Sequence, residues 1–235
     1  MTTKFTSFLL SFISGFIDTA GFIVLSGLFT AHITGNLVLA GAFLINDNNP
    51  EVAARLAMLP VFVIGVMAAF ILTTVLARTL NFSLTILLVV QAVLTIVFSM
   101  LGSFLENDAH QILSPLQVFL VGTVGVFAMC IQNTYMKTHL SSHAPTTVMT
   151  GNLTQFSIDL VNVILIKLNM ANLSSSKSTQ GELTLAINQL GLSLLGFLVG
   201  AMAGALLVAN VGLISCLLPA SFLCVLSMYS KNNSL

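Results

Sequence analysis

The sequence predicts an all-α integral membrane protein: a single helical bundle of about six to eight transmembrane segments, built from two related halves. Composition predicts the membrane class, because 57% of the 235 residues are hydrophobic, only 6% are charged and the mean hydropathy is +1.04. Soluble domains carry about a quarter charged residues, which wet their surface. A repeated motif predicts the two halves.

The repeated motif is Thr34-Gly35-Asn36-Leu37, which returns as Thr150-Gly151-Asn152-Leu153. A second pair follows in the same order, since residues 62–72 and 197–207 are identical at 5 of 11 positions. We therefore expect one duplicated membrane unit within a single transmembrane domain over 1–235. Repeat one covers about residues 8–105 and repeat two about 114–229.

Eight apolar runs are the candidate membrane helices. They lie near Phe8 to Phe29, Ile33 to Ile45, Arg55 to Ala77, Phe82 to Phe104, Pro115 to Met136, Thr147 to Leu168, Leu183 to Ala209 and Val211 to Tyr229. Runs of roughly 17 to 25 residues fit a hydrocarbon core about 30 Å thick. The second run is short and the last two are barely separated, so a re-entrant or broken segment would leave six or seven crossings.

The first run is interpreted as an uncleaved helix, because Asp18 interrupts it and no clear signal-peptidase site follows. If all eight runs cross, the basic residues divide five to two, which favours an N-terminus inside the cell. The five are Lys4, Arg55, Lys167, Lys177 and Lys231, and the two are Arg78 and Lys137. An even number of crossings per half makes the repeats parallel, and an odd number inverts them.

Charge and cysteine content narrow the partners. The formal net charge is zero without a basic cluster, so the lipid bilayer is the expected partner and nucleic acid is not. Three cysteines within apolar runs give no disulfide framework. His139 and His143 stand four residues apart without a third ligand nearby, so we predict loop histidines, no metal site and no cofactor.

The two Thr-Gly-Asn motifs have two interpretations of equal weight. Glycine frees the backbone, while Thr and Asn favour helix starts, so each motif predicts a helix start or break at membrane depth. Paired breaks in two halves are typical of a transporter's binding site. The alternative is that both motifs only cap and pack the second helix of each half.

Polar side chains follow the second motif at helical spacing. Asn152, Gln155, Asp159 and Asn162 share one face of an otherwise apolar helix. This face either lines a wet cavity, which we favour because Asp159 is ionisable, or forms a hydrogen-bond ladder between helices.

Asp18 is a second deep carboxylate, and no Lys or Arg lies mid-segment to pair with it. It is therefore expected to be protonated, hydrated or bound to a cation. At nearly the same distance before the second motif stands Asn133, beside Gln132. We hypothesise that five side chains converge on one polar cavity between the halves: Asp18, Asn36, Asn133, Asn152 and Asp159.

Glycines at spacing four form a ridge at Gly196, Gly200 and Gly204, matched in the first half by Gly65 and Ala69. Such ridges let helix backbones approach closely. This pattern predicts packing and no chemistry.

Taken together, these motifs resemble the YoaK family. The matching order is G-F-x-D at 15–18, H-x-T-G-N at 32–36, Q-N at 132–133 and T-T-x-x-T-G-N-L-T at 146–154. The resemblance covers nearly the whole chain and implies a small bacterial multi-pass protein of the inner membrane. The family has no known function, so it implies no substrate.

The predicted function is a transporter or channel-like protein for a small solute or ion, with its site at the repeated motifs and with Asp18 or Asp159 able to carry a proton. One alternative is a non-catalytic assembly subunit, and a homo-oligomer is compatible with either. A membrane-embedded enzyme is the weaker alternative, because no recognisable nucleophile and base motif is present. We therefore do not expect an enzyme.

Overall fold

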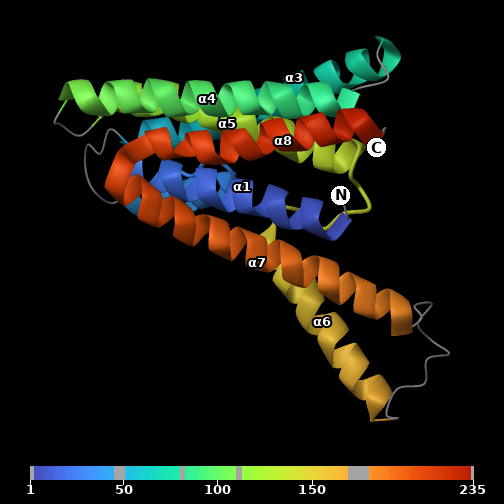
Figure 1. The fold of residues 1–235 in the computed structure, drawn as a ribbon. Coiled ribbons are helices and arrows are strands. Elements are labelled where there is room, and N and C mark those ends of the chain that lie inside the picture. The colour runs from blue at the N-terminus through green and yellow to red at the C-terminus, as the bar shows by residue number, and fades with distance from the viewer. Residues whose placement is uncertain (1–2, 45–50, 80–82, 110–112, 169–179, 234–235) are drawn as a thin grey trace.

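The computed structural model describes residues 3–44, 51–79, 83–109, 113–168 and 180–233, and within them the chain is helical with no strand (Figure 1). The helices are α1 Thr3–Val24, α2 Ile33–Phe43, α3 Glu51–Thr79, α4 Ser83–Ala109, α5 Pro115–Thr138, α6 Met149–Lys167, α7 Gln180–Val211, the short 3-10 helix η2 Gly212–Cys216 and α8 Leu217–Asn233. Each of the eight apolar runs of the sequence contains most of one helix, although α1 begins and ends five residues earlier than its run and α8 begins six residues later. The all-α membrane class is confirmed.

Six of these helices belong to stretches that are long and apolar enough to cross a membrane. Five helical stretches in the described part are long and apolar enough to cross a membrane, and the last, Gly181–Lys231, contains both α7 and α8. The chain reverses between these two at η2, where Gly212 takes a φ of 68° that favours glycine. The candidate crossing helices are therefore α1, α3, α4, α5, α7 and α8. The protein is a multi-pass membrane protein.

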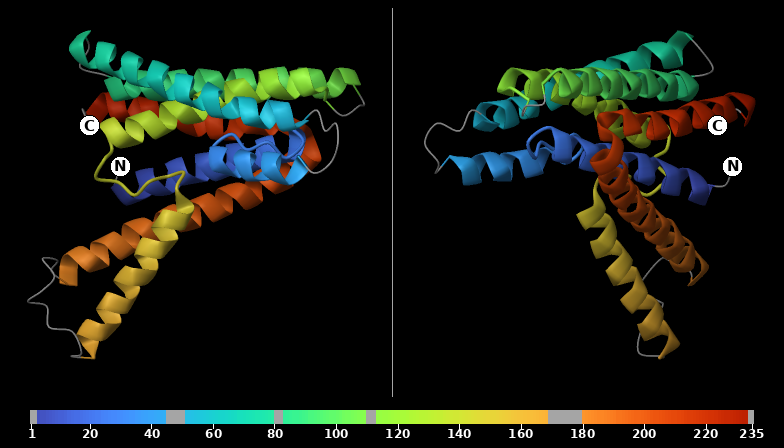
Figure 2. Two further views of the ribbon diagram at one scale, coloured as in Figure 1. Left: turned by 180° about the vertical axis from the view of Figure 1, so that it is seen from behind. Right: turned by 60° about the vertical axis from the view of Figure 1, so that its left-hand side comes forward.

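α2 and α6 each follow a segment that folds into the bundle, and each then runs back to the end from which that segment came: α2 to the end opposite the chain termini, and α6 to the end that carries them (Figure 2). α2 has 11 residues, about 16 Å at 1.5 Å per residue, which is too short for a hydrocarbon core of about 30 Å. The segment before it folds back from the end of α1 into the bundle. In the same way, the segment before α6 folds back from the end of α5, and α6 then runs out to the start of α7 (Figure 2).

This arrangement corrects the charge grouping expected for eight crossings. Because α2 does not cross, Arg55 lies at the end of the bundle opposite both chain termini. The other basic residues described lie at the end that carries the termini, which we call the termini end: Lys4, Arg78, Lys137, Lys167 and Lys231. For these six residues the division becomes five to one, compared with four to two in an eight-crossing arrangement; Lys177 lies outside the described residues.

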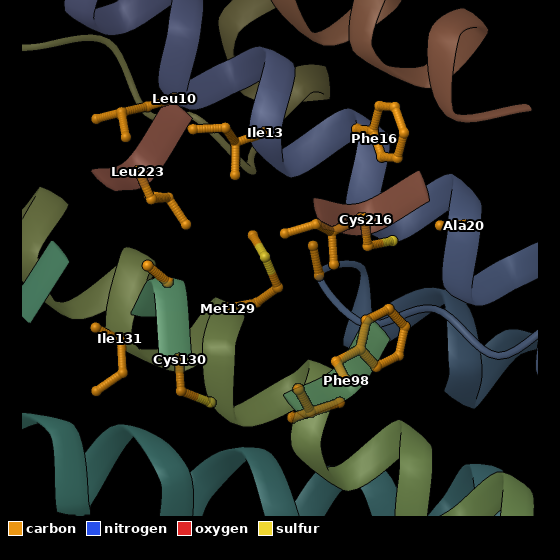
Figure 3. Close-up of a cluster of buried hydrophobic side chains, with 14 of the residues drawn as sticks. Leu10, Ile13, Phe16, Ala20, Phe98, Met129, Cys130, Ile131, Cys216 and Leu223 are labelled. Atoms are coloured by element: carbon orange, nitrogen blue, oxygen red, sulfur yellow. The ribbon is translucent and has the colours of Figure 1, made fainter. Parts of the chain in front are cut away.

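The core lies among the crossing helices, with α1 the most buried of them. Figure 3 shows part of the core, where side chains of α1, α4, α5, η2 and α8 gather in one cluster. Large apolar side chains also point outward, as lipid contact requires; Ile64 and Met67 of α3 and Leu206 of α7 are about 60% exposed. α6 and the first half of α7 diverge from the bundle (Figure 2).

The glycine ridge of α7 lies directly against the backbone of α1. A Cβ atom added at Gly196, Gly200 or Gly204 would stand 2.3, 2.1 or 2.8 Å from the carbonyl oxygens of Phe8, Phe12 and Phe16, respectively. Contacts this short are possible only without a side chain. The packing role predicted for the ridge is correct.

Helix contacts on one side of the bundle have counterparts on the other. α1 packs on α7 as α5 packs on α3, and α2 packs on α3 as α6 packs on α7. The match extends to single residues. The Cys130 thiol of α5 donates to the carbonyl of Phe62 at 3.5 Å, while Gly15 of α1 faces the carbonyl of Phe197.

Candidate functional site: a cavity between two re-entrant segments

Asp18 anchors the first re-entrant segment. It lies six residues before the end of α1, about 9 Å inside the bundle, and is 3% exposed. Its Oδ1 accepts from the backbone N–H groups of Thr30 and Ala31 at 2.8 and 2.6 Å and, more weakly, of His32 at 3.4 Å. The carboxylate therefore satisfies backbone donors that would otherwise be unpaired inside the bundle.

His32 is the partner of Asp18 that the sequence interpretation missed. Its Nδ1 lies 2.6 Å from Oδ2 of Asp18, and its side chain is 33% exposed. The ring also packs edge-on against Phe29 and Phe197, which fixes its orientation. A histidine two residues before Thr-Gly-Asn, at the start of the helix, was the signal available in the sequence.

The asparagine side chains of the two motifs bond the backbone of the loop that precedes their helix. Asn36 donates to the carbonyl of Phe29 and accepts from its N–H, both at 2.8 Å, and is fully buried. Asn152 donates to the carbonyl of Pro145 at 2.6 Å and to Ser193 of α7 at 3.3 Å. Each side chain thus reaches back seven residues and fixes the turn into its short helix. Neither helix has a side-chain N-cap bond.

Gln132 and Asn133 tie the second re-entrant segment to α5. The Gln132 amide donates to Thr146 and to the carbonyl of Leu10, and it accepts from Gln91 of α4. Asn133 accepts from the hydroxyl of Thr147 at 2.6 Å. Neutral amides therefore hold the second re-entrant segment to α5, as Asp18 holds the first re-entrant segment to α1.

A cavity of about 900 Å³ lies between the two anchored segments. The threonines of both motifs, Thr34 and Thr150, line it together with His32 and Asn133. One wall is apolar and comes largely from Phe62, Val66 and Phe70 of α3. From the motifs the cavity extends to a second group of residues where α5 ends, so it leads towards the termini end: Lys137, Thr138, Ser141 and His143.

A smaller cavity of about 410 Å³ lies between α6 and the first half of α7. Gln155 and Asp159 line it, and the Gln155 amide donates to Asp159 at 2.8 Å. His143 borders both cavities, and burial lowers its pKa below the usual value. Within the described residues, no three His, Cys, Asp or Glu side chains are grouped to hold a metal ion.

The expected convergence of five side chains in one cavity is therefore wrong in its geometry. Only Asn133 lines the larger cavity, whereas Asn36 and Asn152 turn back to their own segments and Asp159 lies in the smaller cavity. Asp18 lies behind His32. The cause is that the N–H and C=O groups of the re-entrant backbone need hydrogen-bond partners inside the bundle. The acid and amide side chains serve mostly as these partners, so threonines and a histidine line the larger cavity.

The glycines of the two motifs differ in their surroundings. An added Cβ at Gly35 would stand 2.9 Å from the Phe29 ring, whereas one at Gly151 would make an ordinary contact with Val148 at 3.5 Å. Gly35 is required by close packing. Gly151 faces no comparable restriction.

Residues 6–230 match the family described as "Protein of unknown function (DUF1275)", which contains the YoaK-like membrane proteins. The match covers nearly the whole chain, so the chain belongs to this family. No curated protein and no solved structure matches it.

Proposed function

We propose that this member of the DUF1275 family moves a small solute or ion across the membrane, and that the solute binds in the cavity between the two re-entrant segments. The observation that carries the proposal is the joint presence of Thr34 and Thr150, one from each motif, in the lining of one cavity. Re-entrant backbone at membrane depth is tolerated where it is buried in protein or lines a wet cavity. Asn36 and Asn152 are buried where they hold the two turns, and Thr34 and Thr150 face the cavity, in keeping with this rule.

The arrangement of the helices supports an inverted repeat. Three crossing helices, α1, α3 and α4, precede residue 110, and three, α5, α7 and α8, follow it. An odd number of crossings per half places the halves in opposite orientations, as in many transporters whose site lies at the repeat interface. The paired contacts α1–α7 and α5–α3 are those expected of two interlocked copies.

The two halves differ in a way that suits alternating access. At the end opposite the termini, the turn after α1 is held by Arg55, which donates to the carbonyls of Ser26 and Gly27 and is 2% exposed. Leu190 stands in the corresponding place of the second half. The cavity leads to the termini end, so we assign this structure to a state open there. By the five-to-one division of basic residues, that end is cytoplasmic.

The test is thermal unfolding of the detergent-purified protein against a panel of ions, amino acids, nucleobases, sugars and organic acids. A ligand at 100 times its dissociation constant adds about 2.7 kcal/mol of stability. We expect a compound that stabilises the wild type and fails to stabilise Thr150→Trp, whose ring would fill the cavity.

The matched control is Leu206→Trp, which adds the same ring on the outward face of α7. It should keep the full ligand response. If no compound stabilises the wild type and a partner protein co-purifies in fixed ratio, the assembly subunit replaces the transporter. Asp18 bonds the first re-entrant segment, whereas Asp159 lines the smaller cavity, so the two carboxylates do not form a catalytic pair. The proposal therefore includes no catalytic step.

A further inference from the structure

The ionisable groups that line the larger cavity within the described part of the chain are all basic. They are His32, Lys137 and His143. The nearest carboxylate, Asp18, has Oδ1 occupied by the backbone of the loop and Oδ2 by His32, so it presents no charge directly to the cavity. Seven neutral hydroxyls also line the cavity, and three of them already donate to other groups of the chain: Thr134 to the carbonyl of Cys130, Thr138 to the carbonyl of Thr134, and Thr147 to Asn133. The other four are those of Thr34, Ser141, Thr146 and Thr150.

The bond to Asp18 fixes what His32 offers to the cavity. With Nδ1–H donating to the carboxylate, Nε2 is the ring nitrogen left for a solute. In the neutral ring Nε2 is an acceptor, and after protonation it is a charged donor. One proton therefore converts this point of the lining from a group that repels an anion into one that binds it.

Among the described residues, no other charged group near His32 duplicates this change. α1 contributes Asp18, which favours the imidazolium form, and α5 contributes Lys137 towards the cavity mouth. The second re-entrant segment contributes His143, whose pKa is lowered by burial, which favours its neutral form. α3 and α7 contribute uncharged rings and aliphatic groups, Phe62, Val66, Phe70 and Phe197.

We propose that the cavity binds a small organic anion together with one proton, which resides on Nε2 of His32. The proton comes from the solution at the open end, the anion brings the compensating charge, and the pair leaves the net charge of the site unchanged. The apolar wall on α3 favours an acid with an apolar body. The starts of α2 and α6, which carry partial positive charge, lie in the same lining and add to the preference. This inference rests on the proposed function and names its substrate class.

The experiment compares acids with amides of the same shape: acetate with acetamide, and benzoate with benzamide. Thermal unfolding of the full chain in detergent is followed between pH 6 and pH 8, and titration calorimetry in buffers of different ionisation enthalpy counts protons. We expect an acid to stabilise and its amide not to do so. Affinity should fall as pH rises, approaching tenfold per unit, with uptake approaching one proton per anion at the alkaline end.

The decisive variant is His32→Asn. Its amide keeps a donor close to the Nδ1 position, so the bond to Asp18 and the fold are retained, but the titrating nitrogen is removed. Proton uptake should disappear, and what anion affinity remains should not vary with pH. His139→Asn, which changes a histidine outside both cavity linings, is the control and should behave as wild type.

The outcomes separate the two proposals. Equal stabilisation by acid and amide, without proton uptake, would overturn the anion and proton inference and leave solute binding in the cavity intact. Wild-type proton uptake in His32→Asn would overturn the assignment to His32. Failure of both acids, while a neutral solute of the wider panel binds, would overturn the substrate class. Failure of every compound would remove the proposed function as well.

Discussion

Asp18 and Asn133 do the same structural work with different chemistry. Each lies in the first helix of its half and accepts hydrogen bonds from the segment that folds back towards it. The carboxylate accepts from several backbone N–H groups, whereas the amide accepts from one threonine hydroxyl. The first segment is thus held by more hydrogen bonds to its acceptor than the second is to Asn133.

Removing the two acceptors should therefore have unequal effects. Asp18→Ala leaves the N–H groups of Thr30 and Ala31 without an acceptor in a buried site, at about 1 kcal/mol or more each. We expect a loss of about 2 kcal/mol or more in thermal unfolding, and a smaller loss for Asn133→Ala. Asp18→Asn, which keeps an acceptor oxygen, should lie between them. Equal losses for both alanine variants would contradict this account.

At the scale of helices, the sequence predicts well where each helix lies along the chain, but poorly whether that helix crosses the membrane. Each of the eight apolar runs contains a helix, because apolar length is enough to place one in a membrane. Whether a helix crosses depends on the loop before it. The reversal before α2 needs an acceptor inside the bundle, and that acceptor, Asp18, belongs to the preceding helix, where the sequence alone indicated only an unpaired acid.

A polar stripe on α1 was the signal that could have indicated this depth. Ser7, Ser11, Ser14 and Asp18 follow helical spacing and are all buried, and Ser11 bonds Ser193 of α7 at 2.7 Å. The stripe marks the face of α1 that turns away from lipid. The stripe on α6 was recognised, but Asn152 and Asp159 are buried while Gln155 and Asn162 are exposed, so a shared face does not give a shared environment.

The ridge of α7 gives a prediction about helix packing. Gly200→Ala would place a methyl group 2.1 Å from the carbonyl oxygen of Phe12, and a backbone atom cannot rotate away as a side chain can. We expect a loss of about 1 to 3 kcal/mol in the free energy of unfolding, measured by thermal unfolding.

Gly41→Ala on α2 is the matched control, since nothing lies within 4 Å of its added Cβ. It should be neutral or slightly stabilising, by up to about 1 kcal/mol. Similar losses in both variants would contradict the packing argument.

At the scale of the whole molecule, the number of crossings decides how the halves are related. Eight crossings would place four in each half and make the repeats parallel, while six crossings, which the helix arrangement supports, would place three in each half. With three in each half the two halves have opposite orientations, so an exchange of their conformations would move the opening of the cavity from one side of the membrane to the other. The similarity of residues 62–72 to 197–207 is the same in both cases, so the repeat in the sequence could not settle the relation between its copies.

The two arrangements make opposite predictions for two exposed positions. Leu44 follows α2 and is 65% exposed, and Arg78 is an exposed residue in the last turn of α3. With six crossings and the termini inside, Leu44→Cys faces the outside and Arg78→Cys the cytoplasm. With eight crossings both are reversed. In a background without the native Cys130, Cys216 and Cys224, we expect a membrane-impermeant maleimide to label Leu44→Cys in intact cells.

Arg78→Cys should be labelled only after the membrane is permeabilised. Lys167→Cys is the internal control, because both arrangements place the end of α6 on the side of the N-terminus. If the labelling of all three positions is reversed, the bundle has six crossings but the basic residues do not set its orientation. If Leu44→Cys and Arg78→Cys exchange sides while Lys167→Cys does not, α2 and α6 cross. Alternating access by inverted halves would then be impossible, because each half would keep the same orientation in the membrane.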